Sequence, residues 1–288
     1  MTEKPHPPAA YRLSRPERPG NAVIFASPHS GAYYPDSLQD RSVLDLLRLR
    51  SSEDAFVDRL LATVPDHGAT LIAAEYPRAW VDLNRAEDEL DSALIAGDLR
   101  PHSGPRVAAG LGVIPRVVAG GRSIYRGKIT LAEAQTRLNE VWRPYHAQLG
   151  ALIHSARARH GQAILIDVHS MPSEALDQMG ARRPQIVLGD RYGASAARDL
   201  VARLEAVFAD EGLQVARNAP FAGAYIAQRY GRPSENVHVV QIEIDRSLYM
   251  DEARIEPSAE FQTFSALMER VILQICTIGT QPVRLAAE

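Results

Sequence analysis

The amino-acid sequence predicts an α/β fold, with a central mixed, mostly parallel sheet that helices flank on both faces. The first observation is that short apolar runs alternate along the chain with patterns of helical period, which is typical of strand–helix–strand units. The second is the run Ala-Ile-Leu-Ile at 163–166, which fits a strand buried on both faces. This run leads directly into Asp-Val-His-Ser at 167–170, and open α/β folds bind their ligands at such strand ends.

The composition is that of a globular protein with a large core. The chain has 288 residues, of which 45% are hydrophobic and 23% are charged. The formal net charge of −3 gives no electrostatic reason to expect a nucleic acid or a membrane surface as partner, and no apolar run approaches the roughly 20 residues that span a bilayer. The single cysteine, Cys276, cannot form an intrachain disulfide, so we expect a reducing, cytoplasmic location.

Each element follows from its own pattern in chain order. Residues 1–20 contain five prolines and many charges and predict a Pro-rich N-terminal arm. Residues 21–288 show no repeat and no internal boundary, and predict a single domain. Apolar runs predict strands at 21–26, 69–74, 79–83, 163–170, 186–188, 213–216 and 237–244. Helical periodicity predicts helices at 36–50, 52–64, 130–160, 194–209 and 259–275.

Caps and breakers set the ends of the longest helical pattern. Thr130, with Glu133 three residues later, fits a capping box at its start. Gly161 fits a C-terminal stop, and Pro144 must kink or divide the helix. Ahead of this helix, over 86–123, acidic residues, glycines and prolines replace any periodic pattern. So long an excursion predicts a loop region that borders a site.

Two histidines occupy matching positions: His29 and His169 each follow an apolar strand and precede a serine. Zinc enzymes that hydrolyse amides commonly use two histidines and one carboxylate, and keep a position for water, whose pKa falls toward about 7. Glu53 and Asp54 are the nearest supply of the third ligand, and the pattern leaves both open. Each histidine alone fits a hydrogen-bonded structural residue better, but the matching contexts favour a metal.

Glu243 lies in the apolar pattern 237–244, where alternation puts it on the same face as Gln241. A carboxylate in so apolar a strand is unfavourable unless it is paired or functional. Beside a water molecule at a metal it would act as general base. The alternative is a salt bridge with Arg246 or another arginine, and the strand alone favours neither.

Asn84 and Arg85 follow the predicted strand 79–83 and open the excursion. Arginine binds a carboxylate through two parallel hydrogen bonds and asparagine adds a donor and an acceptor, so the pair suits an acidic substrate; a surface arginine is the alternative. Asp167, two residues before His169, either orients that imidazole or caps a turn. No Gly-x-Ser-x-Gly elbow and no Gly-x-x-x-x-Gly-Lys-Ser/Thr pattern occurs, which disfavours a serine hydrolase and phosphate binding.

Several short motifs follow one another through most of the chain. They are Ser27-Pro28-His29-Ser30-Gly31, Asp82-Leu83-Asn84-Arg85, Gly112-Val113-Ile114-Pro115-Arg116, Pro144-Tyr145-His146, Asp167-Val168-His169-Ser170-Met171-Pro172, Pro220-Phe221-Ala222-Gly223 and Glu243-Ile244-Asp245-Arg246-Ser247-Leu248-Tyr249-Met250. Together, from about residue 21 to 275, they resemble the N-formylglutamate amidohydrolase family. The set is specific to the family rather than to one substrate within it.

The resemblance implies a fold similar to that of zinc-dependent exopeptidases. It implies hydrolysis of N-formyl-L-glutamate to L-glutamate and formate, a late step in one route of histidine degradation. It also implies Zn²⁺ or another divalent metal as cofactor, with His29 and His169 as ligands. The register with Phe-Val-Asp at 56–58 selects Asp54 over Glu53 as the third ligand.

The same resemblance assigns the substrate side of the site. Asn84 and Arg85 resemble the pair with which the wider exopeptidase group holds a substrate carboxylate, and Glu243 resembles its catalytic glutamate. We expect Arg246 to add a second contact to an acidic, small-molecule N-acyl amino acid. Some family members read Gly-Gly-Trp where this chain has Gly-Ala-Tyr at 223–225. The alternatives are therefore a hydrolase of another N-acyl amino acid or short peptide, or a non-catalytic relative that holds a metal or ligand.

Overall fold

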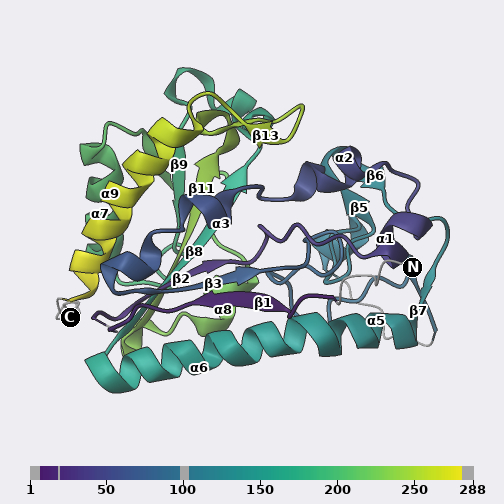
Figure 1. Cartoon of the computed structure of the whole chain (residues 1–288), viewed down its shortest axis with the longest axis horizontal. Coiled ribbons are helices and arrows are strands. Elements are labelled where there is room, and N and C mark those ends of the chain that lie inside the picture. The colour runs from purple at the N-terminus through teal and green to yellow at the C-terminus, as the bar shows by residue number, and fades with distance from the viewer. Residues whose placement is uncertain (1–6, 19, 98–103, 281–288) are drawn as a thin grey trace.

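A mixed sheet forms the centre of the computed structural model, which describes residues 7–18, 20–97 and 104–280 (Figure 1). The strands of this sheet are β1 (Tyr11–Ser14), β2 (Val23–Ser27), β3 (Thr70–Ala74), β8 (Ala163–Met171), β9 (Ile186–Gly189), β10 (Val215–Arg217) and β11 (Val237–Asp245). Among the described residues it has seven strands in the order β1-β3-β2-β8-β11-β9-β10. The pairs β3/β2, β2/β8, β8/β11 and β9/β10 are parallel, and β1/β3 and β11/β9 are antiparallel. The predicted mixed, mostly parallel sheet is confirmed.

Helices and short ribbons complete the fold. The α-helices are α1 (Asp36–Arg41), α2 (Leu46–Leu49), α3 (Val57–Leu60), α4 (Pro105–Ala108), α5 (Leu131–Arg137), α6 (Arg143–His160), α7 (Arg198–Asp210), α8 (Tyr225–Tyr230) and α9 (Phe261–Gly279). The two-stranded ribbons are β4 (Ile95–Ala96) with β7 (Ile129–Thr130), β5 (Val117–Val118) with β6 (Arg122–Ser123), and β12 (Met250–Asp251) with β13 (Glu256–Pro257). Segments of 3₁₀-helix lie at Arg50–Ser52, Val64–His67, Ala119–Gly121, Ser173–Arg182, Pro233–Glu235 and Arg246–Leu248.

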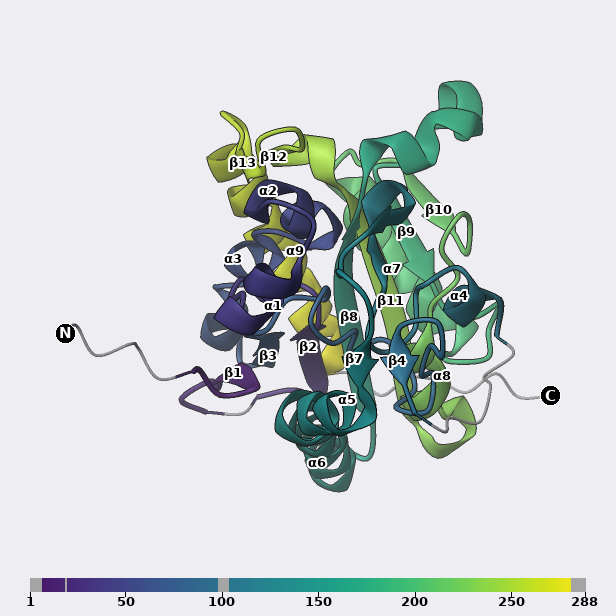
Figure 2. The same ribbon diagram turned by 90° about the vertical axis from the view of Figure 1, so that its right-hand side faces the viewer.

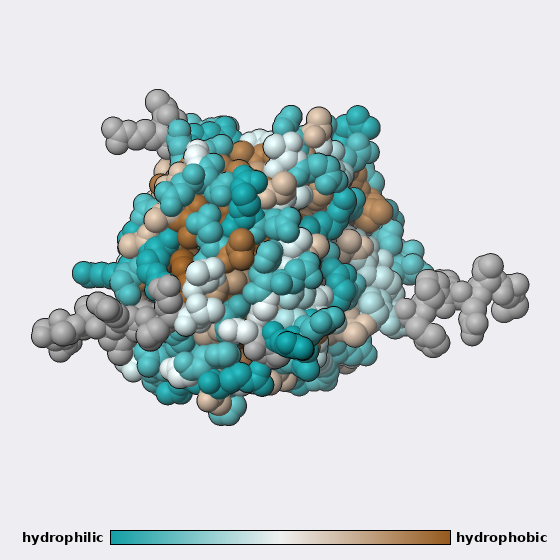
Figure 3. All heavy atoms as spheres, turned by 60° about the vertical axis from the view of Figure 1, so that its left-hand side comes forward, coloured by the Kyte–Doolittle hydropathy of each residue, from teal (hydrophilic) through white to brown (hydrophobic). Residues whose placement is uncertain are grey.

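Strand alternation divides the core into two layers, one on each face of the sheet. Phe25 and Ile166 pack with α3, α7 and α9, whereas Ile24 and Leu165 pack on the other face with α6. Figure 1 shows α7 and α9 together on one side of the strands and α6 along the other, and Figure 2 shows α5 and α6 below β2 and β8. The outer side that carries α7 and α9 is mostly hydrophilic, with small separate hydrophobic patches (Figure 3). No helix among the described residues is long and apolar enough to cross a bilayer.

Most predicted elements are confirmed with shifts of a few residues at their ends. The strand predictions that hold are 21–26, 69–74, 163–170, 186–188, 213–216 and 237–244. The helices predicted at 194–209 and 259–275 correspond to α7 and α9. They hold because each carries a stripe of buried apolar side chains at helical spacing, which is the feature that their sequences display.

The helix predicted at 130–160 is confirmed, and its division lies one turn before Pro144. Thr130 accepts a hydrogen bond from the backbone N–H of Glu133, and Gly161 ends the helix in the left-handed region with φ of 74°. Between α5 and α6 the segment Leu138–Trp142 forms a π-helical turn. Proline has no N–H to donate to the carbonyl four residues earlier and its ring clashes there, so the wider turn relieves that conflict.

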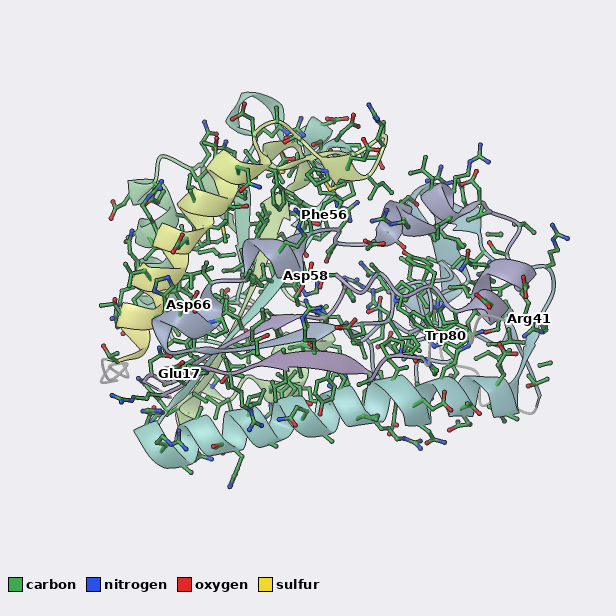
Figure 4. The ribbon with its side chains drawn as sticks, viewed as in Figure 1. Glu17, Arg41, Phe56, Asp58, Asp66 and Trp80 are labelled. Atoms are coloured by element: carbon green, nitrogen blue, oxygen red, sulfur yellow. The ribbon has the colours of Figure 1, made fainter. Side chains whose placement is uncertain are left out.

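The helices predicted at 36–50 and 52–64 are wrong as continuous helices. Residues between α1 and α2 leave the helix at Ser42, which is extended with ψ of 144°, and Asp45 caps α2 by accepting from the N–H of Arg48. Serine and aspartate side chains compete for backbone groups in this way. In the second segment Phe56 has φ of 66°, which delays the helix until α3. Figure 4 shows Phe56 at the start of that short helix.

The strand predicted at 79–83 is also wrong. Residues 77–80 form a turn in which the N–H of Trp80 donates to the carbonyl of Pro77 at 2.9 Å. Ala79, Val81 and Leu83 are nevertheless at most 1% exposed. The alternating apolar pattern therefore indicates only that these side chains are buried. A turn in the interior of the protein buries them as well as a strand would.

The arm predicted at 1–20 contains an unexpected strand. Residues 1–6 and 19 lie outside the described residues, but β1 pairs antiparallel with β3 at the edge of the sheet, with Tyr11 opposite Ala74 and Leu13 opposite Ile72. Its four residues lie between prolines. Short edge strands carry a weak signal because only one side of them is paired.

The loops on either side of the excursion pack onto α5 through a buried arginine. The guanidinium carbon of Arg137 lies 3.5 Å from the centre of the Trp80 ring, and its Nη1 donates to the Tyr125 hydroxyl at 2.7 Å. Glu133 pairs with both Arg137 and Arg41. Figure 4 shows Arg41 on α1 and Trp80 in the loops beside α5. These contacts fix the 77–82 turn against a rigid helix.

Helix α6 and the π-helical turn before it hold the backbone of the segment 83–85. Trp142 Nε1 donates to the carbonyl of Arg85 at 2.9 Å, and His146 Nε2 donates to the carbonyl of Leu83 at 2.9 Å. His146 Nδ1 lies 3.0 Å from the Tyr230 hydroxyl. Burial lowers the pKa of His146 to about 3, so its neutral form is the one that packs here.

We predict that stability falls with acid through His146. Between its ordinary pKa of about 6.5 and the folded value of about 3, the unfolded chain binds a proton that the folded chain does not. This group therefore lowers the free energy of unfolding by about 1.4 kcal/mol for each pH unit below 6.5. His146→Gln removes this pH dependence. Between pH 7 and pH 5 the free energy of unfolding, measured in urea titrations, is therefore expected to fall more for the parent than for the variant. Parallel curves would contradict the assignment.

Candidate metal centre and active site

Three predicted side chains converge at the carboxyl ends of β2 and β8. His29 follows β2, His169 lies near the end of β8, and Asp54 precedes α3. The Nδ1 atoms of the two histidines are 3.1 Å apart, and Asp54 Oδ2 lies 3.1 Å from His169 Nδ1 and 3.5 Å from His29 Nδ1. All three side chains are at most 3% exposed. The structure thus brings together the predicted set His29, Asp54 and His169.

Local backbone contacts explain why Asp54 arrives at this place. Its N–H donates to the carbonyl of His29 at 2.9 Å, which ties the loop before α3 to the turn after β2. That turn requires Gly31, because a Cβ there would lie 2.1 Å from the carbonyl oxygen of Tyr76. Ser27 and Ser30 close the turn with a hydroxyl–hydroxyl bond of 2.8 Å. Backbone contacts, and not a helix, therefore set the position of the acid.

The neighbouring acid, Glu53, points elsewhere. Its carboxylate accepts hydrogen bonds from Arg50 Nε and Nη2 at 3.0 Å and from the Tyr34 hydroxyl at 3.0 Å. Burial and the Glu53 charge raise the pKa of Tyr34 well above its ordinary value. Of the two acids that the sequence left open, only Asp54 faces the histidines.

Each imidazole has a carboxylate on its far side. His29 Nε2 lies 2.8 Å from Asp82 Oδ1, and His169 Nε2 lies 3.1 Å from Asp167 Oδ2. The hydrogen bond to Asp82 fixes the tautomer of His29 that leaves Nδ1 free to bind a metal and raises its basicity. The carboxylate of Asp167 makes no hydrogen bond among the described residues and acts on His169 through its negative charge. Of the two interpretations weighed for Asp167, the structure shows the contact with the imidazole of His169.

The donor set fits a divalent cation. Two imidazole nitrogens and one carboxylate oxygen face a common point, and their separations are close to the roughly 3.4 Å between ligand atoms about 2.1 Å from a tetrahedral zinc ion. Burial would raise the pKa of Asp54, but its hydrogen bonds to His169 and His29 hold that pKa well below the ordinary value. Burial would lower the pKa of His169, but the charge of Asp167 raises it well above the ordinary value. Surroundings this negative also favour a metal cation.

Arg246 supports the carboxylate of Asp54 from the side away from the histidines. Its Nη2 donates to Asp54 Oδ1 at 3.1 Å, its Nε to Ser170 Oγ at 3.1 Å, and its Nη1 to the carbonyl of Ser51 at 3.1 Å. Ser170 Oγ donates in turn to Asp54 Oδ1 at 3.2 Å. Arg246 lines the adjoining cavity, but three of its nitrogens already have protein partners.

Glu243 lies beside the cluster on the next strand. It is the register partner of His169 in the parallel pair of β8 and β11, and it accepts a hydrogen bond from Gln241 Nε2 at 2.8 Å. The predicted shared face of Gln241 and Glu243 is confirmed. No ion pair to Glu243 occurs within the described part of the chain, and Arg246 pairs with Asp54 instead. Burial raises the pKa of Glu243 to about 7, with the charges of Asp54 and Asp167 adding to the effect.

Asn84 and Arg85 lie on the opposite wall. Asn84 Nδ2 is 3.3 Å from both His169 Nε2 and Gln241 Oε1, and its Oδ1 accepts from the N–H of Ile226 at 2.8 Å. Arg85 is 4% exposed, and its buried Nε has no hydrogen-bond partner among the described residues. Burial lowers the pKa of Arg85. A buried guanidinium with an unused donor is suited to an anionic ligand.

A cavity of about 460 Å³ opens beside these groups. Asp54, His169 and Glu243 line its inner end, and the excursion forms its outer wall, with contributions from 109–121. The prediction that 86–123 borders a site is therefore confirmed.

Four residues of the site were not among the predicted site residues: Arg78, Asp82, Arg106 and Gln241. Arg78 donates to Asp82 Oδ2 at 2.9 Å and lines the cavity, as does Arg106. Gln241 bridges Asn84 and Glu243. The alternation in β11 pointed to Gln241, and the family motif contains Asp82. Arg78 and Arg106 gave no signal, because one lies in a turn and the other in the excursion.

Comparison with known proteins agrees with the geometry. The profile of the N-formylglutamate amidohydrolase family matches residues 21–250. The N-formylglutamate deformylases of Pseudomonas aeruginosa and Pseudomonas putida are 35% and 32% identical over 233 residues, which are 80% of this chain and 82% of each relative.

Solved structures give the same result. The N-formylglutamate amidohydrolase of Ralstonia eutropha JMP134 has a TM-score of 0.87 at 36% identity, over 93% of this chain and 98% of that one. A gene product of Agrobacterium tumefaciens, 18% identical with a TM-score of 0.62 over 92% of this chain and 95% of that one, shares the fold. This chain belongs to the N-formylglutamate amidohydrolase family.

Proposed function

We propose that this chain is a metal-dependent amidohydrolase that cleaves N-formyl-L-glutamate to L-glutamate and formate. The observation that carries the proposal is the convergence of His29, Asp54 and His169 next to Glu243 at the wall of a cavity. The substrate comes from the likeness to relatives named N-formylglutamate deformylase, of which one is 35% identical.

His29, Asp54 and His169 would hold Zn²⁺ or another divalent cation through two Nδ1 atoms and one carboxylate oxygen. When bound there, such a cation polarises the amide carbonyl and lowers the pKa of a water molecule. Asp82 keeps the imidazole of His29 in the required tautomer, Asp167 places a negative charge beside His169, and Arg246 keeps Asp54 turned toward them. We therefore assign Arg246 to support of the ligand set in addition to the expected contact with substrate.

Glu243 is the proton carrier in this proposal. As a base with a pKa of about 7, it is suited to accept the proton of the attacking water and to return it to the leaving amine. Arg78 lines the same cavity, and its Nε bond to Asp82 fixes its orientation. Its remaining donors would stabilise the negative charge that develops on the amide oxygen.

The amino-acid part of the substrate would lie against Asn84 and Arg85. Arg85 offers a buried Nε that makes no hydrogen bond and lies 3.9 Å from Asp82 Oδ2, and Asn84 is held in place by Gln241 and Ile226. Arg106, which lines the cavity from α4, would add positive charge for the second carboxylate of glutamate. Fixed arginines of this kind favour a dicarboxylate over a neutral substrate.

The physiological setting is part of the same proposal. The family likeness supports a late step in one route of histidine degradation. Cys276 is buried and free, and a chain without disulfide partners suits the reducing cytoplasm.

We predict that the purified protein contains about one divalent metal per chain and releases formate from N-formyl-L-glutamate. A chelator removes both the metal and the activity, and added Zn²⁺ restores them. The measurements are elemental analysis and a formate assay on one preparation. Metal without formate release would favour the non-catalytic relative, and release that survives complete metal removal would contradict the metal role.

Glu243→Gln tests the proton carrier. Loss of a general base costs roughly 10²–10⁴ in kcat, and glutamine keeps the size and the hydrogen bond from Gln241. The metal content is expected to stay unchanged, which separates loss of chemistry from loss of the centre. Glu269→Gln on the exposed side of α9 is the matched control and keeps full activity. Turnover within about tenfold of the parent would contradict the role.

Arg85→Gln tests the carboxylate contact. Hydrogen bonds to charged groups contribute about 1.5–3 kcal/mol, so KM rises about 10- to 100-fold while kcat changes much less. Arg85→Lys keeps the charge without the paired geometry and gives an intermediate KM. Arg217→Gln, at an exposed pair with Glu205, is the control. An unchanged KM would place the substrate carboxylates elsewhere.

A further inference from the structure

The space beside the metal centre has two parts of unlike chemistry. The polar lobe, of about 240 Å³, is lined by Asn84, Asn218, Gln241 and the loop 220–224. The apolar lobe, of about 460 Å³, extends the other way. Beyond the charged inner end, nine of its lining residues are apolar, namely Ala109, Leu111, Pro115, Val117, Val118, Ala119, Met171, Pro172 and Phe221. The polar side chains in that part are Ser51, Ser52 and Arg106.

The two lobes meet at the reacting groups. His169 and Glu243 line both, as do Arg78, Arg85, Arg106 and Phe221. A scissile amide between His169 and Glu243 therefore has one substituent in each lobe. Asn84 lines the polar lobe and is absent from the walls of the apolar lobe. With the amino-acid carboxylate on Asn84 and Arg85, the acyl group points into the apolar lobe.

A formyl group does not use this lobe. It has one carbon and one oxygen, so nearly all of a space of about 460 Å³ stays filled with water against apolar walls. Burial of an alkyl chain against apolar walls raises its affinity by roughly fourfold for each methylene. The apolar side chains of the lobe offer no hydrogen bond to an acyl chain. Arg106 is assigned above to the second carboxylate of glutamate, which leaves Ser51 and Ser52 as the polar side chains beyond the inner end.

We propose that the site hydrolyses N-acyl-L-glutamates whose acyl group is a longer alkyl chain, and that the apolar lobe binds that chain. The inference rests on the proposed function, because it uses the same centre and the same contacts to the amino acid. In the reaction a water oxygen bonds to the acyl carbon, the C–N bond breaks, and the amine nitrogen takes the proton. The products are an alkanoate and L-glutamate.

A homologous series of substrates tests the proposal. N-acetyl-, N-butanoyl- and N-hexanoyl-L-glutamate share one leaving amine and one type of amide carbonyl, so differences in kcat/KM report binding of the chain. We expect kcat/KM to rise with chain length, with the hexanoyl compound about tenfold or more above the acetyl compound. N-succinyl-L-glutamate, which places a carboxylate in the lobe, is expected to be a poorer substrate than the butanoyl compound.

Two substitutions assign the effect to the lobe. Ala119→Phe places a ring in the lobe from a half-buried position and is expected to lower kcat/KM for the hexanoyl compound at least tenfold, with the formyl compound within about twofold. Leu111→Ala removes wall area and flattens the dependence on chain length without adding bulk. Ala132→Phe, on the exposed side of α5, is the matched control and changes neither substrate.

The outcomes separate this inference from the proposed function. Formate release with no gain across the series, or a gain that Ala119→Phe and Leu111→Ala leave intact, overturns the inference and keeps the proposed function. A gain with chain length that both variants reduce supports the inference. Hydrolysis of none of the compounds by metal-loaded protein overturns the proposed function, and the inference with it.

Discussion

Four buried carboxyl groups beside two imidazoles set the main constraint on this structure: Asp54, Asp82, Asp167 and Glu243. Removing charged carboxylates from water is costly unless nearby positive charge compensates them. Arg246 compensates Asp54 and Arg78 compensates Asp82. A cation between the two Nδ1 atoms and Asp54 would supply positive charge at the centre of the cluster. The arrangement proposed to bind a metal would therefore also offset the cost of burying these carboxylates.

The sheet makes this cluster possible because its inner strands are parallel. Their carboxyl ends lie at one edge, so the polar residues at the ends of β2, β8 and β11 meet there. Side chains alternate between the two faces of a strand, so His169, four residues after Leu165 in β8, lies on the same face as Leu165. Its register partner Glu243 in β11 lies on that face as well. Core packing and site geometry are thus set by one register.

The substrate side is built differently, from loops fastened to rigid elements. Helix α6 and the π-helical turn before it hold the carbonyls of Leu83 and Arg85 through His146 and Trp142. Stacking of Arg137 on Trp80 fastens the preceding turn. Irregular backbone can then present Asn84 and Arg85 at fixed positions, because the surrounding helices supply the order that the loop lacks.

The sequence by itself determined the α/β class, the main strands, the long capped helix and the pairing of His29 with His169, because apolar runs and strand-end residues are local signals. It also identified Glu243, since a carboxylate inside an apolar strand stands out. The pattern of residues left Glu53 and Asp54 open and the family resemblance favoured Asp54; the tertiary structure shows that Asp54 meets the histidines. Only the tertiary structure decided that Arg246 holds Asp54, that 79–83 is a buried turn and that Arg78 and Arg106 line the cavity. These depend on contacts such as the Asp54 N–H to the His29 carbonyl, between residues far apart in the chain, and no local pattern records them.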